Sequence, residues 1–134
     1  MNTIGFIGLG NMGTGMSINL LKNGIKVLGY DINKDVYKNF KNHKIQLVDH
    51  IKNLVEESKI IITMLPDGTI VKKVWTDVMS YTKPNQYLID CSTIDVKTSK
   101  YIQNEAKENN LFTLDAPVSG GVIGADQGTL TFMV

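Results

Sequence analysis

The chain has 134 residues, of which 43% are hydrophobic and 20% charged, and its formal net charge is +1. This length and composition fit a single globular domain with an apolar core that needs no disulfide or structural metal. The small net charge and the lack of any cluster of five like charges indicate neither a nucleic-acid surface nor a membrane-surface patch. No apolar run approaches the roughly 20 residues that span a bilayer.

Cys91 is the only cysteine, so an internal disulfide is excluded, and no Cys/His spacing indicates a metal site. A lone cysteine is typical of a reducing compartment. The first predicted strand begins almost at Met1, which leaves no room for a targeting segment. We therefore expect the cytoplasm, or the mitochondrial matrix if a transit segment has been removed.

The first 31 residues predict a strand, a glycine-rich turn, a helix and a second strand. An apolar run at 4–7 leads into Gly8–Gly13, and apolar residues at helical spacing follow as far as Gly24. A second apolar run, 27–30, ends at Asp31. This order is the fingerprint of a βαβ unit that binds a dinucleotide. The alternative is a glycine-rich turn that merely joins a strand to a helix.

Each glycine of the turn has a separate role in this interpretation. Gly8 permits a tight turn, Gly10 lets a pyrophosphate approach the backbone, and Gly13 lets the helix lie close to the sheet. The free N–H groups and the dipole of the helix start then face the phosphates. We therefore predict that the whole turn contacts the cofactor, through Gly8, Leu9, Gly10, Asn11, Met12 and Gly13.

Asp31 lies 18 residues after Gly13, at the predicted tip of the second strand. A carboxylate there accepts hydrogen bonds from ribose hydroxyls and repels a 2′-phosphate. The next residue is Ile32 rather than an arginine, so we predict NAD in preference to NADP, although Lys34 is near enough to weaken the discrimination. The alternative is that Asp31 only caps the following helix.

Strands and helices continue to alternate along the rest of the chain. Further strands are predicted at 45–48, 59–65, 86–91, 111–114 and 129–134. Four helices are predicted: one that Asn33 caps, one at 49–57 that Asp49 caps, one after Gly68 and one at 95–109. The last helix has Val96, Ser99, Ile102 and Ala106 on its buried face. Residues 115–128 are predicted to be a loop.

This alternation predicts an α/β fold, a Rossmann-type doubly wound and mainly parallel sheet that forms one dinucleotide-binding domain over 1–134. Ligands bind outside the carboxyl ends of the strands of such a sheet. The segments 8–13, 65–67 and 115–121, together with Asp31 and Ser92–Thr93, follow such ends. We therefore expect them to line one crevice.

Two of these segments have alternatives that the residues alone leave open. Leu65–Pro66 ends the longest buried strand, either as a wall against the cofactor or as a plain strand-ending turn. The hydroxyls of Ser92 and Thr93 either bond the nicotinamide side of the ligand or cap the next helix, and without a family argument the cap is favoured.

The segment 115–121 has the sequence Asp-Ala-Pro-Val-Ser-Gly-Gly. Gly120 and Gly121 leave successive backbone N–H groups unshielded, and the hydroxyl of Ser119 adds a donor. Such a nest favours a small carboxylate. The alternative is a flexible glycine loop.

Several of these stretches together resemble the β-hydroxyacid dehydrogenase family, over the whole chain. FIGLGNMGTGMSINLLKNG is similar to that family's cofactor signature, although Met16-Ser17 replaces its usual Met-Ala. DAPVSGG resembles its substrate-binding motif, which is more specific. IITMLP, LIDCSTID and GTLTFMV resemble the 3-hydroxyisobutyrate dehydrogenase branch, an enzyme of valine catabolism.

The resemblance implies an NAD-linked oxidoreductase that converts a small β-hydroxy carboxylate to its semialdehyde or back. It implies cofactor contacts at 8–13, Asp31, Leu65, Pro66 and Thr93, to which we add Ile32. It implies substrate-carboxylate contacts at Ser119, Gly120 and Gly121.

The resemblance also implies that part of the enzyme lies outside this sequence. The family's catalytic lysine lies on a C-terminal, all-helical domain beyond residue 134, which also builds an oligomer, so no catalytic residue is assigned within this chain. We expect 1–134 to be part of a longer protein, inactive by itself and at most weakly NAD-binding. The alternatives are a sibling enzyme, such as a tartronate semialdehyde reductase, and a non-catalytic Rossmann module.

Overall fold

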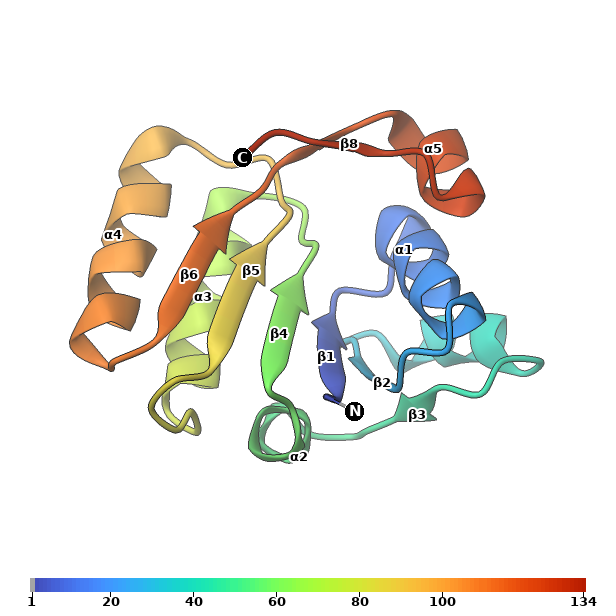
Figure 1. The fold of residues 1–134 in the computed structure, drawn as a ribbon, viewed down its shortest axis with the longest axis horizontal. Coiled ribbons are helices and arrows are strands. Elements are labelled where there is room, and N and C mark those ends of the chain that lie inside the picture. The colour runs from blue at the N-terminus through green and yellow to red at the C-terminus, as the bar shows by residue number, and fades with distance from the viewer. Residues whose placement is uncertain (1) are drawn as a thin grey trace.

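A six-stranded sheet in which every neighbouring pair is parallel forms the centre of the structure, a computed structural model that describes residues 2–134 (Figure 1). The strand order is β3-β2-β1-β4-β5-β6. The strands are β1 (Ile4–Ile7), β2 (Val27–Tyr30), β3 (Gln46–Leu47), β4 (Ile60–Thr63), β5 (Tyr87–Asp90) and β6 (Phe112–Asp115). The predicted doubly wound, mainly parallel sheet is confirmed.

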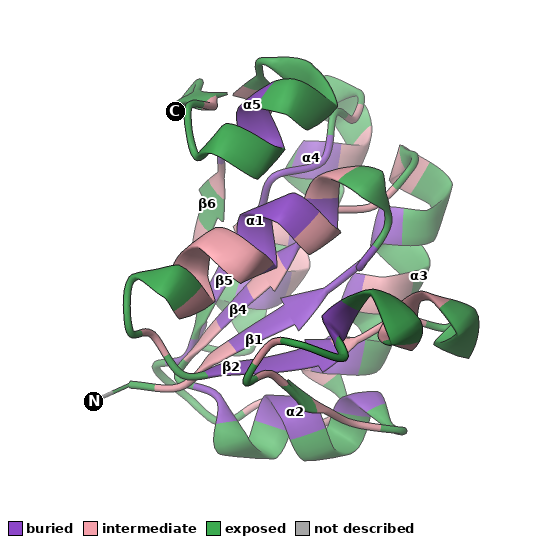
Figure 2. Cartoon of the chain, turned by 90° about the vertical axis from the view of Figure 1, so that its right-hand side faces the viewer, coloured by how far each residue is buried: buried purple, intermediate pink, exposed green. Residues whose placement is uncertain are grey.

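Helices cover both faces of this sheet. They are α1 (Asn11–Lys22), α2 (Ile51–Glu57), α3 (Gly68–Met79), α4 (Val96–Glu108) and α5 (Gly121–Gln127), with a 3₁₀ helix η1 (Lys34–Phe40). Figure 2 shows the buried strands β1 and β2 lying between α1 and α2. No helix among residues 2–134 is both long enough and apolar enough to cross a membrane.

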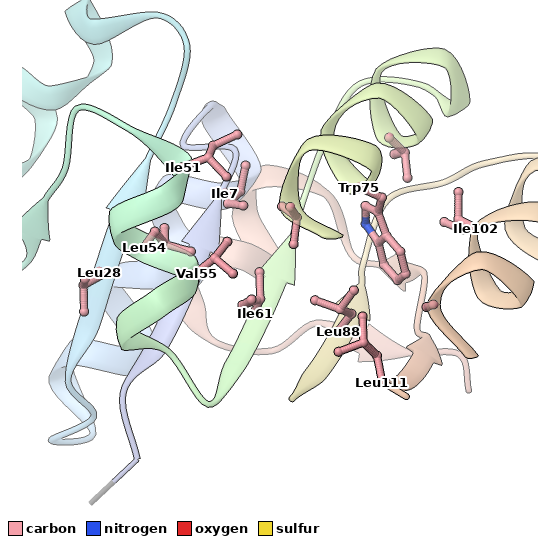
Figure 3. Packing of buried hydrophobic residues seen from close by; sticks show 13 residues of the cluster. Ile7, Leu28, Ile51, Leu54, Val55, Ile61, Trp75, Leu88, Ile102 and Leu111 are labelled. Atoms are coloured by element: carbon pink, nitrogen blue, oxygen red, sulfur yellow. The ribbon is translucent and has the colours of Figure 1, made fainter. Parts of the chain in front are cut away.

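The apolar residues separate into one core cluster for each face. The larger cluster joins the sheet to α2, α3 and α4, and Trp75 and Leu54 are among its fully buried members (Figure 3). The smaller cluster packs Phe6 of β1 against Met16 of α1 and Ala125 of α5. Residues of one strand alternate between the two clusters, because successive side chains of a strand point to opposite faces.

Side-chain caps begin three of the helical segments. The carboxylates of Asp67 and Asp95 accept from the N–H groups of Ile70 and Thr98, each at 2.9 Å. The side chain of Asn33 accepts from Asp35, as predicted, although η1 is a 3₁₀ helix. The prediction that Asp49 caps α2 is wrong, because His50 occupies that position without a side-chain hydrogen bond.

The end of the chain differs most from the prediction. Residues 115–128 are not a loop, because they contain β7 (Val118–Ser119) and α5. The predicted strand 129–134 is only β8 (Thr131–Phe132), which pairs antiparallel with β7 apart from the main sheet. Val96 is also exposed rather than on the buried face of α4, since it is the first residue of that helix.

Candidate functional site

Five segments that sequence analysis singled out follow the carboxyl ends of neighbouring strands. The last residues of these strands are register partners: Ile7 pairs with Tyr30 and with Thr63, Thr63 with Asp90, and Asp90 with Asp115. The glycine turn, Asp31 and the segments beginning at 65, 92 and 116 therefore leave the sheet at one edge (Figure 1). This edge is where doubly wound sheets bind their ligands.

Gly8 and Gly13 allow the turn to pack closely against neighbouring backbone atoms. Gly8 has a φ of +101°, and a Cβ there would collide with the carbonyl of Met64. A Cβ on Gly13 would collide with the carbonyl of Gly8, so the first turn of α1 lies directly on the end of β1. Both positions require glycine for the fold itself, independently of any ligand.

Gly10 differs, because the described residues leave open space around it. A Cβ built there would have no atom within 4 Å. Gly10 is also the N-cap of α1, and neither a side-chain cap nor an acidic residue occupies this helix start. The N–H groups of the first turn and the positive end of the helix dipole thus face the opening, which is suited to a phosphate. Asn11 is exposed there, and Met12 is half-buried.

Asp31 is bonded directly to the glycine turn. Its Oδ2 accepts from the N–H of Leu9 at 2.7 Å, and its Oδ1 accepts from the N–H of Asn33 at 2.8 Å. Leu9 is fully buried, so its side chain lies in the core and its N–H orients the acid. The alternative that Asp31 only caps the next helix is wrong, because Asn33 is that cap.

Lys34 is held beside Asp31 by oxygen atoms of the protein. Its Nζ donates to the carbonyl of Asp31 at 2.9 Å, to the Tyr37 hydroxyl at 3.2 Å and to the Asp49 carbonyl at 3.3 Å. It also lies 4.0 Å from the ring centroid of Tyr30, within the range of a cation–π interaction. Ile32, by contrast, is 84% exposed and projects no charge at the strand tip.

The ends of β4 and β5 are linked by a side chain. The N–H of Leu65 donates to the hydroxyl of Ser92 at 2.8 Å, and Ser92 is completely buried. Asp95 caps α4, so the interpretation of Ser92 and Thr93 as helix caps is wrong. Thr93 is exposed at the edge, as is Pro66, whereas Leu65 is half-buried.

A buried polar group beneath this link was not predicted. Thr63 donates to Oδ1 of Asp90 at 2.8 Å and accepts from Nε1 of Trp75 at 3.1 Å. Burial raises the pKa of Asp90, although hydrogen bonds from Ser92 and Thr63 oppose this. The sequence signal was an acid at the end of the apolar run YLID, but strand pattern alone does not identify its partners.

The segment 115–121 forms a short strand and the start of α5. Ser119, Gly120 and Gly121 are exposed, and the two glycines have φ values of +133° and +63°. Helix α5 packs on α1, where Nδ2 of Asn19 donates to the carbonyl of Ala125 at 2.6 Å. The glycine pair thus belongs to an ordered element held against the helix of the glycine turn, rather than to a free loop.

Cys91 lacks the features of an activated nucleophile. Cys91 is buried, and burial together with the charges of Asp90 and Asp115 raises its thiol pKa to about 12. Its thiol is therefore protonated at neutral pH and a poor nucleophile. No cluster of metal-ligating side chains that could hold an ion occurs among residues 2–134.

Comparison with known proteins places this geometry in context. Residues 3–134 match the family model described as the NAD binding domain of 6-phosphogluconate dehydrogenase. A probable mitochondrial 3-hydroxyisobutyrate dehydrogenase of Dictyostelium discoideum is 40% identical over 98% of this chain, and the mitochondrial enzyme of Mus musculus is 42% identical over 98%.

A solved structure of Mycobacterium tuberculosis 3-hydroxyisobutyrate dehydrogenase with L-serine superposes on 99% of this chain, with a TM-score of 0.95 and 41% identity. The match covers 46% of that protein, 42% of the Dictyostelium relative and 40% of the mouse relative. The chain therefore spans less than half the length of the relatives that it matches.

Proposed function

This chain belongs to the family of the NAD binding domain of 6-phosphogluconate dehydrogenase, and on that premise we propose that it is the cofactor-binding part of a β-hydroxyacid dehydrogenase. The reaction interconverts a small β-hydroxy carboxylate resembling 3-hydroxyisobutyrate and its semialdehyde. The observation that most strongly supports this proposal is that the glycine turn, Asp31 and the 116–121 segment lie at the same edge of the sheet. Relatives about 40% identical bear the name of that enzyme, which supports the choice of reaction.

In this proposal the glycine turn holds the pyrophosphate. The open space at Gly10 lets phosphate oxygens approach the backbone, and the uncapped start of α1 supplies N–H donors. Leu65, Pro66 and Thr93 lie at the ends of the next two strands and contact the rest of the cofactor. When bound, NAD accepts or supplies the hydride, and this chain binds and orients it.

Asp31 favours NAD over NADP. Each of its carboxylate oxygens accepts one N–H bond, which leaves lone pairs on both for ribose hydroxyls. A 2′-phosphate at the same place would meet a negative charge. Lys34 bonds three neutral oxygen atoms of the protein beside Asp31, so its positive charge weakens this repulsion.

Ser119, Gly120 and Gly121 bind the substrate carboxylate in this proposal. Their exposed position and the left-handed backbone of the glycines leave N–H groups accessible to an anion. The Mycobacterium tuberculosis relative was solved with L-serine, which is itself a β-hydroxy carboxylate and therefore supports this substrate class.

We assign the acid–base chemistry to a part of the protein outside residues 1–134. The chain spans less than half of its relatives, and Lys34, the lysine beside Asp31, is occupied by other contacts. In this proposal a second, helical domain supplies the catalytic lysine, closes the crevice and forms the oligomer. A reducing compartment, the cytoplasm or the mitochondrial matrix, suits the single buried thiol.

The direct test measures binding and turnover on the same purified 134-residue chain. We expect weak but saturable NAD binding by calorimetry and no formation of NADH when 3-hydroxyisobutyrate is added. The full-length Mycobacterium tuberculosis relative provides the positive control for turnover. NADH formation by the chain at the rate of that control would contradict the proposal that the acid–base residue lies outside residues 1–134. Absence of NAD binding would contradict the proposal that this chain binds the cofactor.

A further inference from the structure

We infer that Thr63 and Asp90 form a buried clamp that positions the cofactor-facing segments Leu65–Pro66 and Ser92–Thr93. The inference rests on the proposed NAD-binding function and adds two positioning residues to it. Neither side chain reaches the surface, since each is 1% exposed. They act through the backbone that follows them.

The clamp consists of a continuous series of hydrogen bonds. Trp75 of α3 donates to Thr63, and Thr63 donates to Oδ1 of Asp90, its register partner on β5. The same oxygen accepts from the N–H of Ser92 at 3.1 Å, and the Ser92 hydroxyl accepts from the N–H of Leu65 at 2.8 Å. The series therefore starts on a helix of the large core cluster and ends at both strand tips.

The position of the clamp along the sheet argues for a role beyond stability. The preceding residues on the same face, Ile61 and Leu88, are apolar and buried in the large core cluster. An apolar pair would continue that layer without the cost of desolvating a carboxylate. Oδ2 of Asp90 is also buried without a partner among residues 2–134, an unfavourable arrangement that the packing of the core does not require.

The main-chain hydrogen bonds of the two strands do not by themselves fix these tips. The register of β4 with β5 ends at Thr63 and Asp90, after which Cys91 still donates to the carbonyl of Thr63 at 2.8 Å. Beyond that point the Leu65–Ser92 bond joins the two segments, and Asp90 orients Ser92. Loss of the clamp would therefore leave the strands paired and the cofactor-facing tips free to shift.

The test compares NAD affinity, measured by calorimetry well below the melting temperature, among four variants of the chain. Thr63→Val keeps the shape but removes both bonds of the Thr63 hydroxyl. Ser92→Ala removes the hydroxyl that accepts from the N–H of Leu65 and that also bonds Asp90. We expect each to weaken NAD binding about tenfold, whereas Thr63→Ser keeps the hydroxyl and binds within about twofold of the unsubstituted chain.

The fourth variant, Gln86→Met, controls for a general loss of stability. Gln86 is a buried polar residue at the opposite end of β5, where its amide bonds the carbonyls of Val55 and Ser58. We expect a lower melting temperature but an NAD affinity within about twofold of the unsubstituted chain, because the carboxyl edge is untouched.

Trp75 gives a spectroscopic signature of the clamp, since it is the only tryptophan in the chain. Its emission should change in Thr63→Val, which removes its acceptor, and should stay unchanged in Ser92→Ala. If Thr63→Val does not fold, Ser92→Ala decides the outcome. Unchanged NAD affinity in folded Thr63→Val or in Ser92→Ala, or an equal loss in Gln86→Met, would overturn the clamp. Absence of NAD binding by the unsubstituted chain would overturn it together with the proposed function.

Discussion

Single side chains set the chemistry of the sheet edge, and Asp31 is the clearest example. It connects the glycine turn to the second strand through the N–H of Leu9 and still exposes carboxylate lone pairs to a ligand. Its neighbour Ile32 is exposed and uncharged, whereas Lys34 is occupied by three oxygens of the protein. The carboxylate of Asp31 and the ammonium of Lys34 therefore lie near each other at the tip of the second strand.

The double variant Asp31→Ser, Ile32→Arg should move cofactor preference toward NADP. It removes the charge that repels a 2′-phosphate and adds a guanidinium able to bind one. We expect the ratio of the dissociation constants for NAD and NADP, measured by calorimetry, to change at least about tenfold.

Asp35→Ser is the matched control for this variant. Asp35 is a nearby exposed acid in the first turn of η1, away from the glycine turn. The control should leave the ratio unchanged. If the double variant also leaves it unchanged, Asp31 does not select the cofactor.

At the residue scale, the sequence predicts those residues whose placement depends on the local chain pattern alone. The positions of Gly8 and Gly13 in the turn and of Asp31 at the end of β2 could be predicted, because turn geometry and strand ends follow from local pattern. Thr63, Asp90 and Trp75 could not, because their bonds join residues 12 and 27 positions apart. Hydrophobic periodicity carries no information about which polar side chains meet across strands.

At the scale of elements, the glycine turn joins β1 to α1 at a distance that no larger residue permits. Gly13 lies against the carbonyl of Gly8, and Gly8 lies against that of Met64. Gly10 has no such neighbour. Glycine thus serves packing at two positions of the turn and, in our proposal, ligand approach at the third.

Gly13→Ala and Gly10→Ala should separate these two roles. We expect Gly13→Ala to lower the free energy of unfolding by about 1–3 kcal/mol, because the methyl group overpacks the contact between helix and strand. Gly10→Ala should cost less stability, since the added methyl meets open space and the φ of −74° suits alanine. It should instead weaken NAD binding.

Chemical denaturation and calorimetry on the two variants provide the measurement. Equal losses of stability would show that Gly10 also has a packing role. Unimpaired NAD binding by Gly10→Ala would show that no phosphate approaches this residue.

Elements with strong local patterns were predicted well, and those that depend on tertiary contacts were not. Helix α5 has the sequence GVIGADQ, whose two glycines give low helix propensity. It forms where Asn19 of α1 donates to its carbonyl groups and Gly15 allows close packing. The predicted loop therefore missed an element that its neighbour stabilises.

At the scale of the whole molecule, the two faces of the sheet are covered unequally. Helices α2, α3 and α4 bury one face, whereas α1, η1 and α5 contribute to the other. A cavity of about 580 Å³ lies between α1, α5 and the β4–β6 part of the sheet, with Ile62, Ile89 and Leu114 in its lining. The carboxyl edge, by contrast, carries backbone donors and the charge of Asp31.

The architecture itself could be predicted, because alternating apolar runs and helical patterns permit few topologies. The parallel sheet and the shared carboxyl edge follow from that alternation and are confirmed. The antiparallel pair of β7 and β8 was not foreseen, because its strands are two residues long and carry no alternating pattern. The roles of the predicted site residues stay proposals.

The most direct test of the central claim is an NMR titration of the isotope-labelled chain with NAD. We expect saturable shifts of the backbone amides at Gly8–Gly13 and Asp31, with smaller shifts at Leu65 and Thr93. The amides of Ser58 and Gln86, which precede β4 and β5 on the far side from the carboxyl edge, should not move. Shifts confined to that far side, or no saturable shift at all, would contradict the proposal that NAD lies along the carboxyl edge.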